Sequence, residues 1–281
     1  MREKTNKQKI FLILFGILLT FALLEIGLRL GGFLLSSNRF NNRIDYNNET
    51  YVVLCLGEST TAKLPGENSW PEELEISLNQ RNKKIKFQVV NEGLIGVTST
   101  YIISHIEENL VRYKPDMVIT MMGINDNDPY VRYEKGFFEN LRTLELFRLL
   151  KSHLESKIKD LDDKKQEVLV NKEISYYNSS TYNNYQTLYN ILNERKVKLV
   201  IMQYPMRNVK EFKNMFDEEQ QQNVIFVSNE ENFKKALENA SYDDYFTDHF
   251  AGDFGHCTLK GNMLIAENVA DVVLNELNAV Y

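Results

Sequence analysis

A serine follows directly on a short apolar run, in the sequence Gly57-Glu58-Ser59-Thr60-Thr61. A serine hydroxyl is a weak nucleophile unless a base takes its proton, so a catalytic role for Ser59 requires a base elsewhere in the chain. An isolated serine at such a place more often serves as a turn or helix-cap residue. The segment also differs from the G-x-S-x-G elbow of α/β-hydrolases, because Thr61 stands where the last glycine would be.

The chain has four histidines, and only His256 has an acidic residue three positions before it, Asp253. A carboxylate at that spacing can reach the imidazole around a turn and hold it as a general base. His105 falls in a predicted helix, His153 lies in a charge-dense stretch, and His249 has no acid at the matching position. The sequence therefore favours His256 as the base, with Asp253 as its partner.

The same segment has a second interpretation, as a metal site made of Asp248, His249, Asp253 and His256. No other cluster in the sequence with the spacing of metal ligands supports it. We therefore expect no metal.

Two further polar segments follow predicted strands. In residues 91–99, NEGLIGVTS, Gly93 and Gly96 allow tight turns and let a backbone N–H face a ligand. In residues 123–126, GIND, the amide of Asn125 can donate to a developing oxyanion. Taken singly, an ordinary strand-to-helix loop explains the first segment, and an Asx turn or helix cap explains the second.

Strand-like and helix-like segments alternate along most of the chain. Short apolar runs predict strands, and longer periodic segments predict helices. The predicted strands are 51–56, 85–90, 117–122, 197–203 and 224–227, and the main predicted helices are 71–80, 99–113, 181–195 and 259–277. This alternation predicts an α/β fold with a doubly wound, mainly parallel five-stranded sheet. Ligands of such sheets bind at the carboxyl ends of the strands, where Ser59, residues 91–99 and Asn125 converge.

The amino-terminal segment predicts a membrane anchor. Residues 10–24 carry no charge, and the apolar character continues to residue 35, interrupted only by Glu25 and Arg29. A helix through residues 10–35 would be about 39 Å long, which exceeds the roughly 30 Å of a bilayer core. The cations that precede this run predict a cytoplasmic amino terminus. A cleaved signal peptide is the alternative, although no small-x-small cleavage site stands before Ser36.

The predicted organisation then follows along the chain. It consists of a basic cytoplasmic tail (1–9), a single-pass transmembrane anchor (10–35), a polar linker (36–50) and a catalytic domain (51–281). The anchor would lie in the cell membrane, and the catalytic domain would be extracytoplasmic. Residues 134–195 predict a helical insertion in that domain. This insertion is either a lid or side lobe, or a solvated helical segment with no role at the site.

Composition excludes one class of partner. Hydrophobic residues make up 43% of the 281 residues, which is enough for a sizeable core. The net charge is −6 although the first nine residues are basic, so the rest of the chain is more acidic still. An acidic domain repels phosphate backbones, and we expect no nucleic-acid partner.

Four short blocks occur in one order along the chain: GEST (57–60), NEGLIGVTS (91–99), GIND (123–126) and DFGH (253–256). Together they resemble the sequence blocks of the SGNH/GDSL hydrolase family, and the resemblance covers roughly residues 51–130 and 196–275. Glu58 is a departure, because the family usually has aspartate there. The resemblance implies a flavodoxin-like strand order, acyl transfer through an ester intermediate on the serine, and no need for a cofactor.

The resemblance also implies roles for individual residues. Ser59 would be the nucleophile, His256 the base and Asp253 its orienting acid. The N–H groups of Ser59 and Gly96 and the amide of Asn125 would form the oxyanion hole. We expect a serine esterase that removes an acetyl or other small acyl group from a cell-surface or exported glycan. Two alternatives stay open: an O-acyltransferase with the same residues, and a non-catalytic binding or assembly protein on the same fold.

Overall fold

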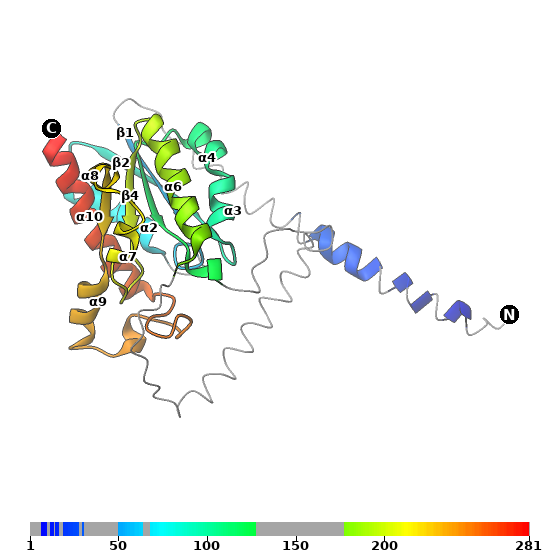
Figure 1. Ribbon diagram of the computed structural model, residues 1–281. Coiled ribbons are helices and arrows are strands. Elements are labelled where there is room, and N and C mark those ends of the chain that lie inside the picture. The colour runs from blue at the N-terminus through cyan, green and yellow to red at the C-terminus, as the bar shows by residue number, and fades with distance from the viewer. Residues whose placement is uncertain are drawn as a thin grey trace. The chain divides into compact units, whose positions relative to one another are not determined.

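The computed structural model describes residues 50–63, 68–127 and 177–280, together with scattered residues between 7 and 30. The chain divides into two compact units, one made of residues 44–133 and 172–281 and the other of residues 1–43 and 134–171. The first unit holds all the candidate catalytic residues, and Figure 1 labels most of its helices and strands.

The first unit is built on a five-stranded sheet in which all neighbouring strands are parallel. Its strands are β1 (Thr50–Gly57), β2 (Lys86–Gly93), β3 (Met117–Met121), β4 (Lys198–Met202) and β5 (Val224–Val227). Their order, β2-β1-β3-β4-β5, is that of a flavodoxin-like doubly wound sheet. The predicted sheet is thereby confirmed. Strand β2 runs three residues further than predicted, because Gly93 still pairs with Gly57 of β1.

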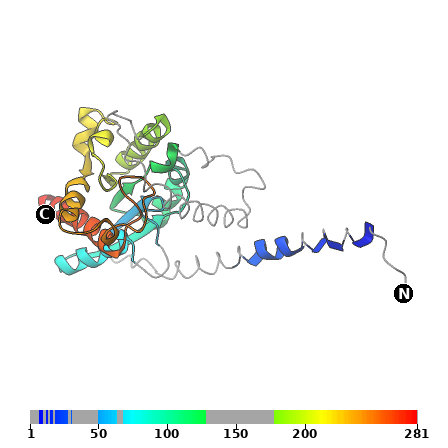
Figure 2. The ribbon, with the colours of Figure 1, turned by 90° about the horizontal axis from the view of Figure 1, so that it is seen from below.

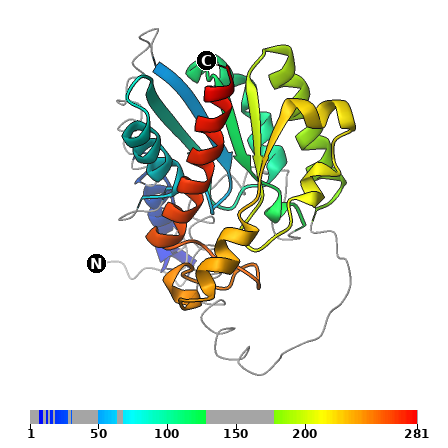
Figure 3. The same ribbon diagram turned by 90° about the vertical axis from the view of Figure 1, so that its left-hand side faces the viewer.

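Helices cover both faces of the sheet. They are α2 (Trp70–Arg81), α3 (Ser99–Ser104), α4 (Ile106–Tyr113), α6 (Ser179–Glu194), α7 (Lys210–Lys213), α8 (Glu218–Asn223), α9 (Glu230–Leu237) and α10 (Leu259–Val280). Helices α2 and α10 pack against each other on one face, and α3, α4 and α6 lie on the other (Figures 1, 2 and 3). The strands are apolar almost throughout because this arrangement buries both faces.

One predicted helix is broken into two. Residues 99–113 form α3 and α4, separated by His105. The His105 ring nitrogen Nδ1 lies 3.0 Å from the carbonyl oxygen of Tyr101, which a continuous helix would reserve for the His105 N–H. That N–H turns to the carbonyl of Ile102 instead. A local side-chain bond of this kind competes with the helical hydrogen-bond ladder.

Helix α2 protects the outer edge of the sheet. Strand β2 is an edge strand, and its outward N–H groups would be open to pairing with another chain. The Asn79 side chain accepts from the Phe87 N–H and donates to the Phe87 carbonyl, both at 2.9 Å. Glu75 accepts from the Val89 N–H at 2.7 Å. These side chains make hydrogen bonds to the backbone of β2 that a further strand would otherwise make.

Residues 128–176, which hold most of the predicted insertion 134–195, lie outside the described residues. The rest of that range is helix α6, which confirms the helix predicted at 181–195. It buries Tyr185, Leu188 and Leu192 as an ordinary covering helix of the sheet.

The described residues between 7 and 30 are helical. Within the parts of the chain that the structure describes, no helix is both long and apolar enough to cross a membrane. Part of the predicted anchor 10–35 and residues 36–49 of the predicted linker lie outside those parts. The anchor therefore stays a prediction.

Candidate active site

Ser59 lies in the tight turn that follows β1. The N–H groups of Thr61 and Ala62 both donate to the carbonyl of Glu58 at 3.0 Å, which closes the chain around Ser59. The side chain of Ser59 is half-buried. The turn thus holds the hydroxyl at the carboxyl end of the sheet, where the sequence predicted it.

His256 faces Ser59 from the loop before α10. Its Nε2 lies 2.8 Å from Ser59 Oγ, and its Nδ1 lies 2.7 Å from Oδ2 of Asp248. A carboxylate only accepts hydrogen bonds, so Nδ1 carries the proton and Nε2 offers its lone pair to the serine hydroxyl. The ring is therefore in the tautomer that a general base for Ser59 requires.

Asp248 holds this loop as well as the imidazole. Its Oδ1 accepts from the backbone N–H of His256 at 3.0 Å and of Phe250 at 3.1 Å. Burial by itself raises the pKa of the Asp248 carboxyl, but the hydrogen bonds and charge of His256 and the Phe250 N–H outweigh it and hold the pKa below its usual value. Asp248 is therefore ionised at neutral pH and can stabilise an imidazolium.

The close approach of Asp248 depends on a glycine. A Cβ on Gly255 would lie 1.7 Å from the backbone carbonyl oxygen of Asp248, so no other residue fits at that position without moving the loop. The Thr247 N–H donates to the His256 carbonyl at 2.8 Å, which joins the two ends of the loop. The loop thus returns on itself and brings Asp248 beside His256.

The structure does not pair Asp253 with His256, which corrects the contact that the sequence predicted. Oδ1 of Asp253 lies 3.4 Å from Nη2 of Arg207, and Asp248 occupies the Nδ1 side of the imidazole. The spacing of three residues suggested a regular turn. Instead, Gly252 adopts a left-handed conformation with φ +84°, and the fully buried Phe254 fixes the next residue. These constraints direct Asp253 toward Arg207.

The two predicted oxyanion loops lie together. Asn125 belongs to a short 3₁₀ helix (Ile124–Asn127) after β3, and its Nδ2 donates to the Val97 carbonyl at 2.8 Å. Gly96, one residue earlier than Val97, is exposed and has a left-handed φ of +69°. The amide of Asn125 thus has a fixed position beside the Gly96 loop, with a second N–H left to donate.

Asp126 braces this pair of loops. Its carboxylate accepts from the backbone N–H of Ser99 at 2.8 Å and from the hydroxyl of Thr181 at 2.6 Å. The first contact joins the start of α3, and the second joins the start of α6. Asn125 is therefore positioned by the helices on one face of the sheet.

Glu58, which precedes the serine, is completely buried. Its Oε1 accepts from the Gly123 N–H at 2.8 Å, and its Oε2 accepts from the hydroxyl of Tyr204. The same Tyr204 oxygen accepts from the Ile124 N–H at 3.3 Å. Glu58 therefore ties the turn that holds Ser59 to the loop that holds Asn125.

Burial raises the pKa of Glu58 to about 8, against the lowering effect of its hydrogen bonds from Tyr204 and Gly123. The nearby charge of Asp126 adds to the rise. Glu58 is thus mainly neutral at pH 7, so the turn around Ser59 carries no buried charge. From the sequence we noted Glu58 only as a departure from the family pattern.

A small cavity adjoins Ser59. It has a volume of about 30 Å³. Its walls are formed by Ser59, Thr60, Ala62, Asn68, Ser69, His256, Cys257 and Asn262. This cavity is open to solvent and leaves room for a small group beside the Ser59 hydroxyl.

The metal interpretation of the same loop finds no support in the arrangement of its side chains. Among the described residues, no three His, Cys, Asp or Glu side chains gather as a metal site requires. The ring of His249 stacks on the ring of Tyr242, with the two ring centroids 4.0 Å apart. This contact does not involve His256.

The comparison with known families agrees with this arrangement. The sequence profile of the GDSL-like lipase/acylhydrolase family matches residues 53–269. The chain belongs to this family. It is therefore an ester-hydrolysing member of the GDSL-like acylhydrolases, and the resemblance seen in the sequence is confirmed. No curated protein matches this acylhydrolase in sequence.

Several solved structures are similar to this GDSL-like acylhydrolase. A catalytic mutant of Axe2, an acetylxylan esterase from Geobacillus stearothermophilus, is 16% identical with a TM-score of 0.50, and the match covers 78% of this chain and 92% of that one. A Desulfitobacterium hafniense protein, described as lipolytic and of the G-D-S-L family, is 18% identical with a TM-score of 0.45, covering 79% and 98%. LAE5, an enzyme from the Lake Arreo metagenome, is 16% identical with a TM-score of 0.44, covering 78% and 93%.

Proposed function

We propose that this acylhydrolase is a serine esterase in which Ser59 is the nucleophile, His256 the general base and Asp248 the orienting acid. The observation that carries the proposal is the 2.8 Å contact between Ser59 Oγ and His256 Nε2. This contact supports His256 as the base, because it lies within hydrogen-bond reach of the Ser59 hydroxyl. The 2.7 Å contact between His256 Nδ1 and Asp248 supports Asp248 as the acid that orients the imidazole.

In the first half of the reaction, Ser59 Oγ attacks the ester carbonyl carbon while Nε2 of His256 takes the hydroxyl proton. The tetrahedral intermediate then collapses, the bond to the alcohol oxygen breaks, and the imidazolium gives its proton to that oxygen. In the second half, water attacks the acyl-serine while His256 takes a proton from it. The carboxylic acid leaves and Ser59 regains its hydroxyl proton from His256.

The developing oxyanion would be bound by the N–H groups of Ser59 and Gly96 and by the amide of Asn125. What supports this role for Asn125 is the fixed position of its amide, which one hydrogen bond to Val97 holds beside the Gly96 loop. Donors that are already oriented stabilise the transition state without reorganising during the reaction.

The acyl group is proposed to be acetyl. The cavity beside Ser59 is small, about 30 Å³, and Cys257 in its wall is held by an antiparallel bridge to Phe246, which together support a short acyl group.

The alcohol is proposed to be a glycan hydroxyl outside the cytoplasm. Two observations support this part: the basic residues and apolar run at the amino terminus, which predict an anchor with the domain outside, and the fold shared with an acetylxylan esterase. The anchor would hold the esterase close to cell-surface or exported polysaccharide.

The proposal is tested by assaying the purified full-length chain on p-nitrophenyl acetate, butyrate and octanoate, and on an acetylated oligosaccharide. We expect activity to fall steeply from acetate to butyrate and free acetate to appear from the oligosaccharide. The Ser59→Ala variant is the matched control for background hydrolysis. Equal or greater activity on octanoate would contradict the acetyl assignment, and no release of acetate from any glycan would contradict the glycan assignment.

A further inference from the structure

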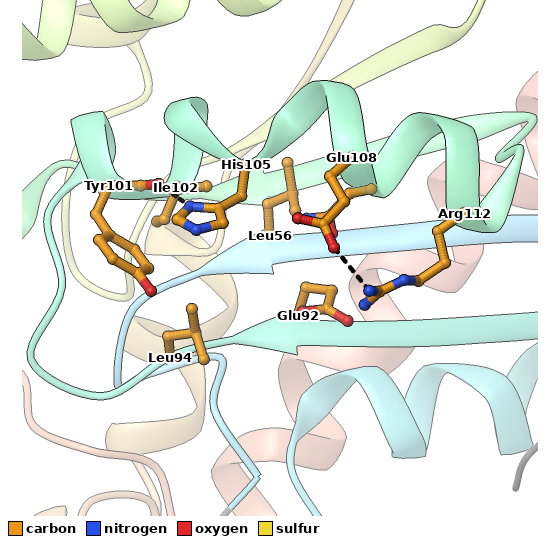
Figure 4. A pocket seen from close by; sticks show the side chains of 9 residues that line it. Leu56, Glu92, Leu94, Tyr101, Ile102, His105, Glu108 and Arg112 are labelled. Atoms are coloured by element: carbon orange, nitrogen blue, oxygen red, sulfur yellow. Dashed lines mark hydrogen bonds and ion pairs between the residues drawn. The ribbon is translucent and has the colours of Figure 1, made fainter. Parts of the chain in front are cut away.

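A second and larger cavity lies away from Ser59 and His256. It has a volume of about 190 Å³ and is open on one side. It is lined by Leu56, Glu92, Leu94, Tyr101, Ile102, His105, Glu108, Asn109 and Arg112, which we call the β2–α4 groove. Figure 4 shows side chains of α3 and α4 on one side of this groove, with Leu56, Glu92 and Leu94 on the other. The groove shares no lining residue with the cavity beside Ser59.

Asn109 marks the groove as a place for a polar ligand. It sits on the face of α4 that packs toward the sheet, and only 8% of it is exposed. Within the described part of the chain, its side-chain amide makes no hydrogen bond to protein. The atoms of this amide are not among the buried polar atoms without a partner in the described part of the chain, so they face the open side of the groove, where a ligand can take the place of water on them.

The groove offers alternating hydrogen-bond donors and acceptors. The carboxylates of Glu92 and Glu108 accept, the guanidinium of Arg112 donates, and the Asn109 amide does both. Glu108 and Arg112 pair across one turn of α4 at 2.7 Å, as the dashed line in Figure 4 shows. Two carboxylates against one guanidinium disfavour an anion. The lining instead suits hydroxyl groups, each of which donates and accepts.

The rest of the lining is apolar. Leu56, Leu94 and Ile102 contribute aliphatic surface, and the ring of Tyr101 lies 4.5 Å from that of His105. Such surface suits the C–H faces of a sugar ring. The cavity equals the volume of about six waters at roughly 30 Å³ each, which is comparable to one pyranose unit.

The groove also adjoins a loop of the catalytic region. Leu94, in its lining, stands two residues before Gly96, and Tyr101 belongs to α3, which starts at Ser99 beside Asp126. From this geometry we infer that the β2–α4 groove binds one uncharged sugar unit of the glycan whose acetyl group is removed at Ser59. The inference rests on the glycan esterase function proposed above.

The test measures binding of unacetylated sugars to the full-length chain by titration calorimetry. The probes are xylotetraose, cellotetraose and chitotetraose, which offer different sugars and carry no O-acetyl ester to be cleaved. We expect saturable binding of at least one probe. The Asn109→Leu variant should bind that probe at least about tenfold more weakly, a loss of the size expected for one or two hydrogen bonds to the ligand.

Two further variants separate binding from folding. Asn109→Leu should melt close to the temperature of the wild type, because the change breaks no hydrogen bond within the described part of the chain. Glu108→Gln, on the exposed side of the groove, should also weaken binding. The control is Val111→Ala on the same helix, whose side chain is outside the groove and 69% exposed, and which should bind as the wild type does.

The hydrolysis of p-nitrophenyl acetate distinguishes the two proposals. It should stay within about twofold of the wild type in all three variants, because this ester carries no sugar. If the wild type cleaves it but binds none of the tetrasaccharides, or if Asn109→Leu and Glu108→Gln bind as the wild type does, the groove is not a sugar site. If the wild type cleaves no ester at all, the esterase proposal itself fails.

Discussion

Asp248 contacts His256 twice, through Oδ2 to the ring nitrogen Nδ1 at 2.7 Å and through Oδ1 to the backbone N–H at 3.0 Å. One carboxylate therefore fixes both the orientation of the imidazole and the path of the chain that carries it. The ring is held with Nε2 toward Ser59 before any substrate arrives, which lowers the cost of orienting the base during the reaction.

Changing each of the two acids to asparagine tests which of them orients His256. Asp248→Asn should lower kcat by about 10²–10⁴, because the amide cannot stabilise the imidazolium and permits the wrong tautomer. Asp253→Asn should cost less than about tenfold, since Asp253 contacts Arg207 rather than the imidazole. Steady-state kinetics on p-nitrophenyl acetate measure both. A larger loss in Asp253→Asn would restore the assignment made from the sequence spacing.

Removing the nucleophile gives the most direct test of the chemistry. Ser59→Ala should reduce ester cleavage by at least about 10³-fold, because the hydroxyl forms the covalent intermediate. Labelling by a fluorophosphonate should disappear in the same variant. Circular dichroism should remain unchanged, since the half-buried side chain contributes little packing. Activity within tenfold of the wild type would remove Ser59 from the mechanism.

Two histidine variants form a matched pair. His256→Ala should be nearly as inactive as Ser59→Ala, because no other base contacts Ser59 Oγ among the described side chains. His249→Ala should retain most activity, since its ring stacks on Tyr242. A pH–rate profile of each variant provides the comparison. The base would be wrongly assigned if the change at His249 proved the more damaging.

The sequence predicted the fold better than the site. Most strands are short apolar runs that end near glycine or proline, as β1, β3 and β4 do, and such runs can be recognised locally. The break at His105 and the partner of His256 depend on contacts that no periodicity reveals. Asp248 reaches the imidazole only because Gly255 permits a close approach and Gly252 turns the chain. Asp248 was present in the sequence, but its eight-residue separation gave no sign of a pair.

Glu58 predicts a dependence of stability on pH. Its pKa is about 8 in the folded chain and near 4.5 as an unperturbed group, so folding takes up a proton between these values. The free energy of unfolding should therefore fall as the pH rises from about 4.5 to 8, by up to about 5 kcal/mol from this group alone. Below pH 4.5 the carboxyl is neutral in both states, and above pH 8 the loss is complete.

Glu58→Gln removes that dependence, because the amide has the shape of the neutral acid and does not ionise. Urea unfolding at pH 5 and pH 8.5 should show a smaller difference between the two conditions for this variant than for the wild type. The Gln side chain can still accept from the Gly123 N–H, so activity at pH 7 should be largely kept. Identical pH dependence in both proteins would mean that Glu58 titrates normally.

The last prediction concerns the orientation of the chain in the membrane. The cations before residue 10 predict an amino terminus that stays inside, with residues 10–35 as the anchor and the esterase outside. A cation at the centre of a membrane helix costs about 2.5–3.5 kcal/mol, so Arg29 must lie near the outer interface or beyond the end of the span. Alkaline phosphatase fused after Tyr281 should be active, and carbonate washing should leave the protein in the membrane pellet. Recovery of a soluble product that begins near Ser36 would mean that the segment is a cleaved signal. The catalytic assignment would survive that outcome, because Ser59, Asp248 and His256 all belong to the unit that begins at residue 44.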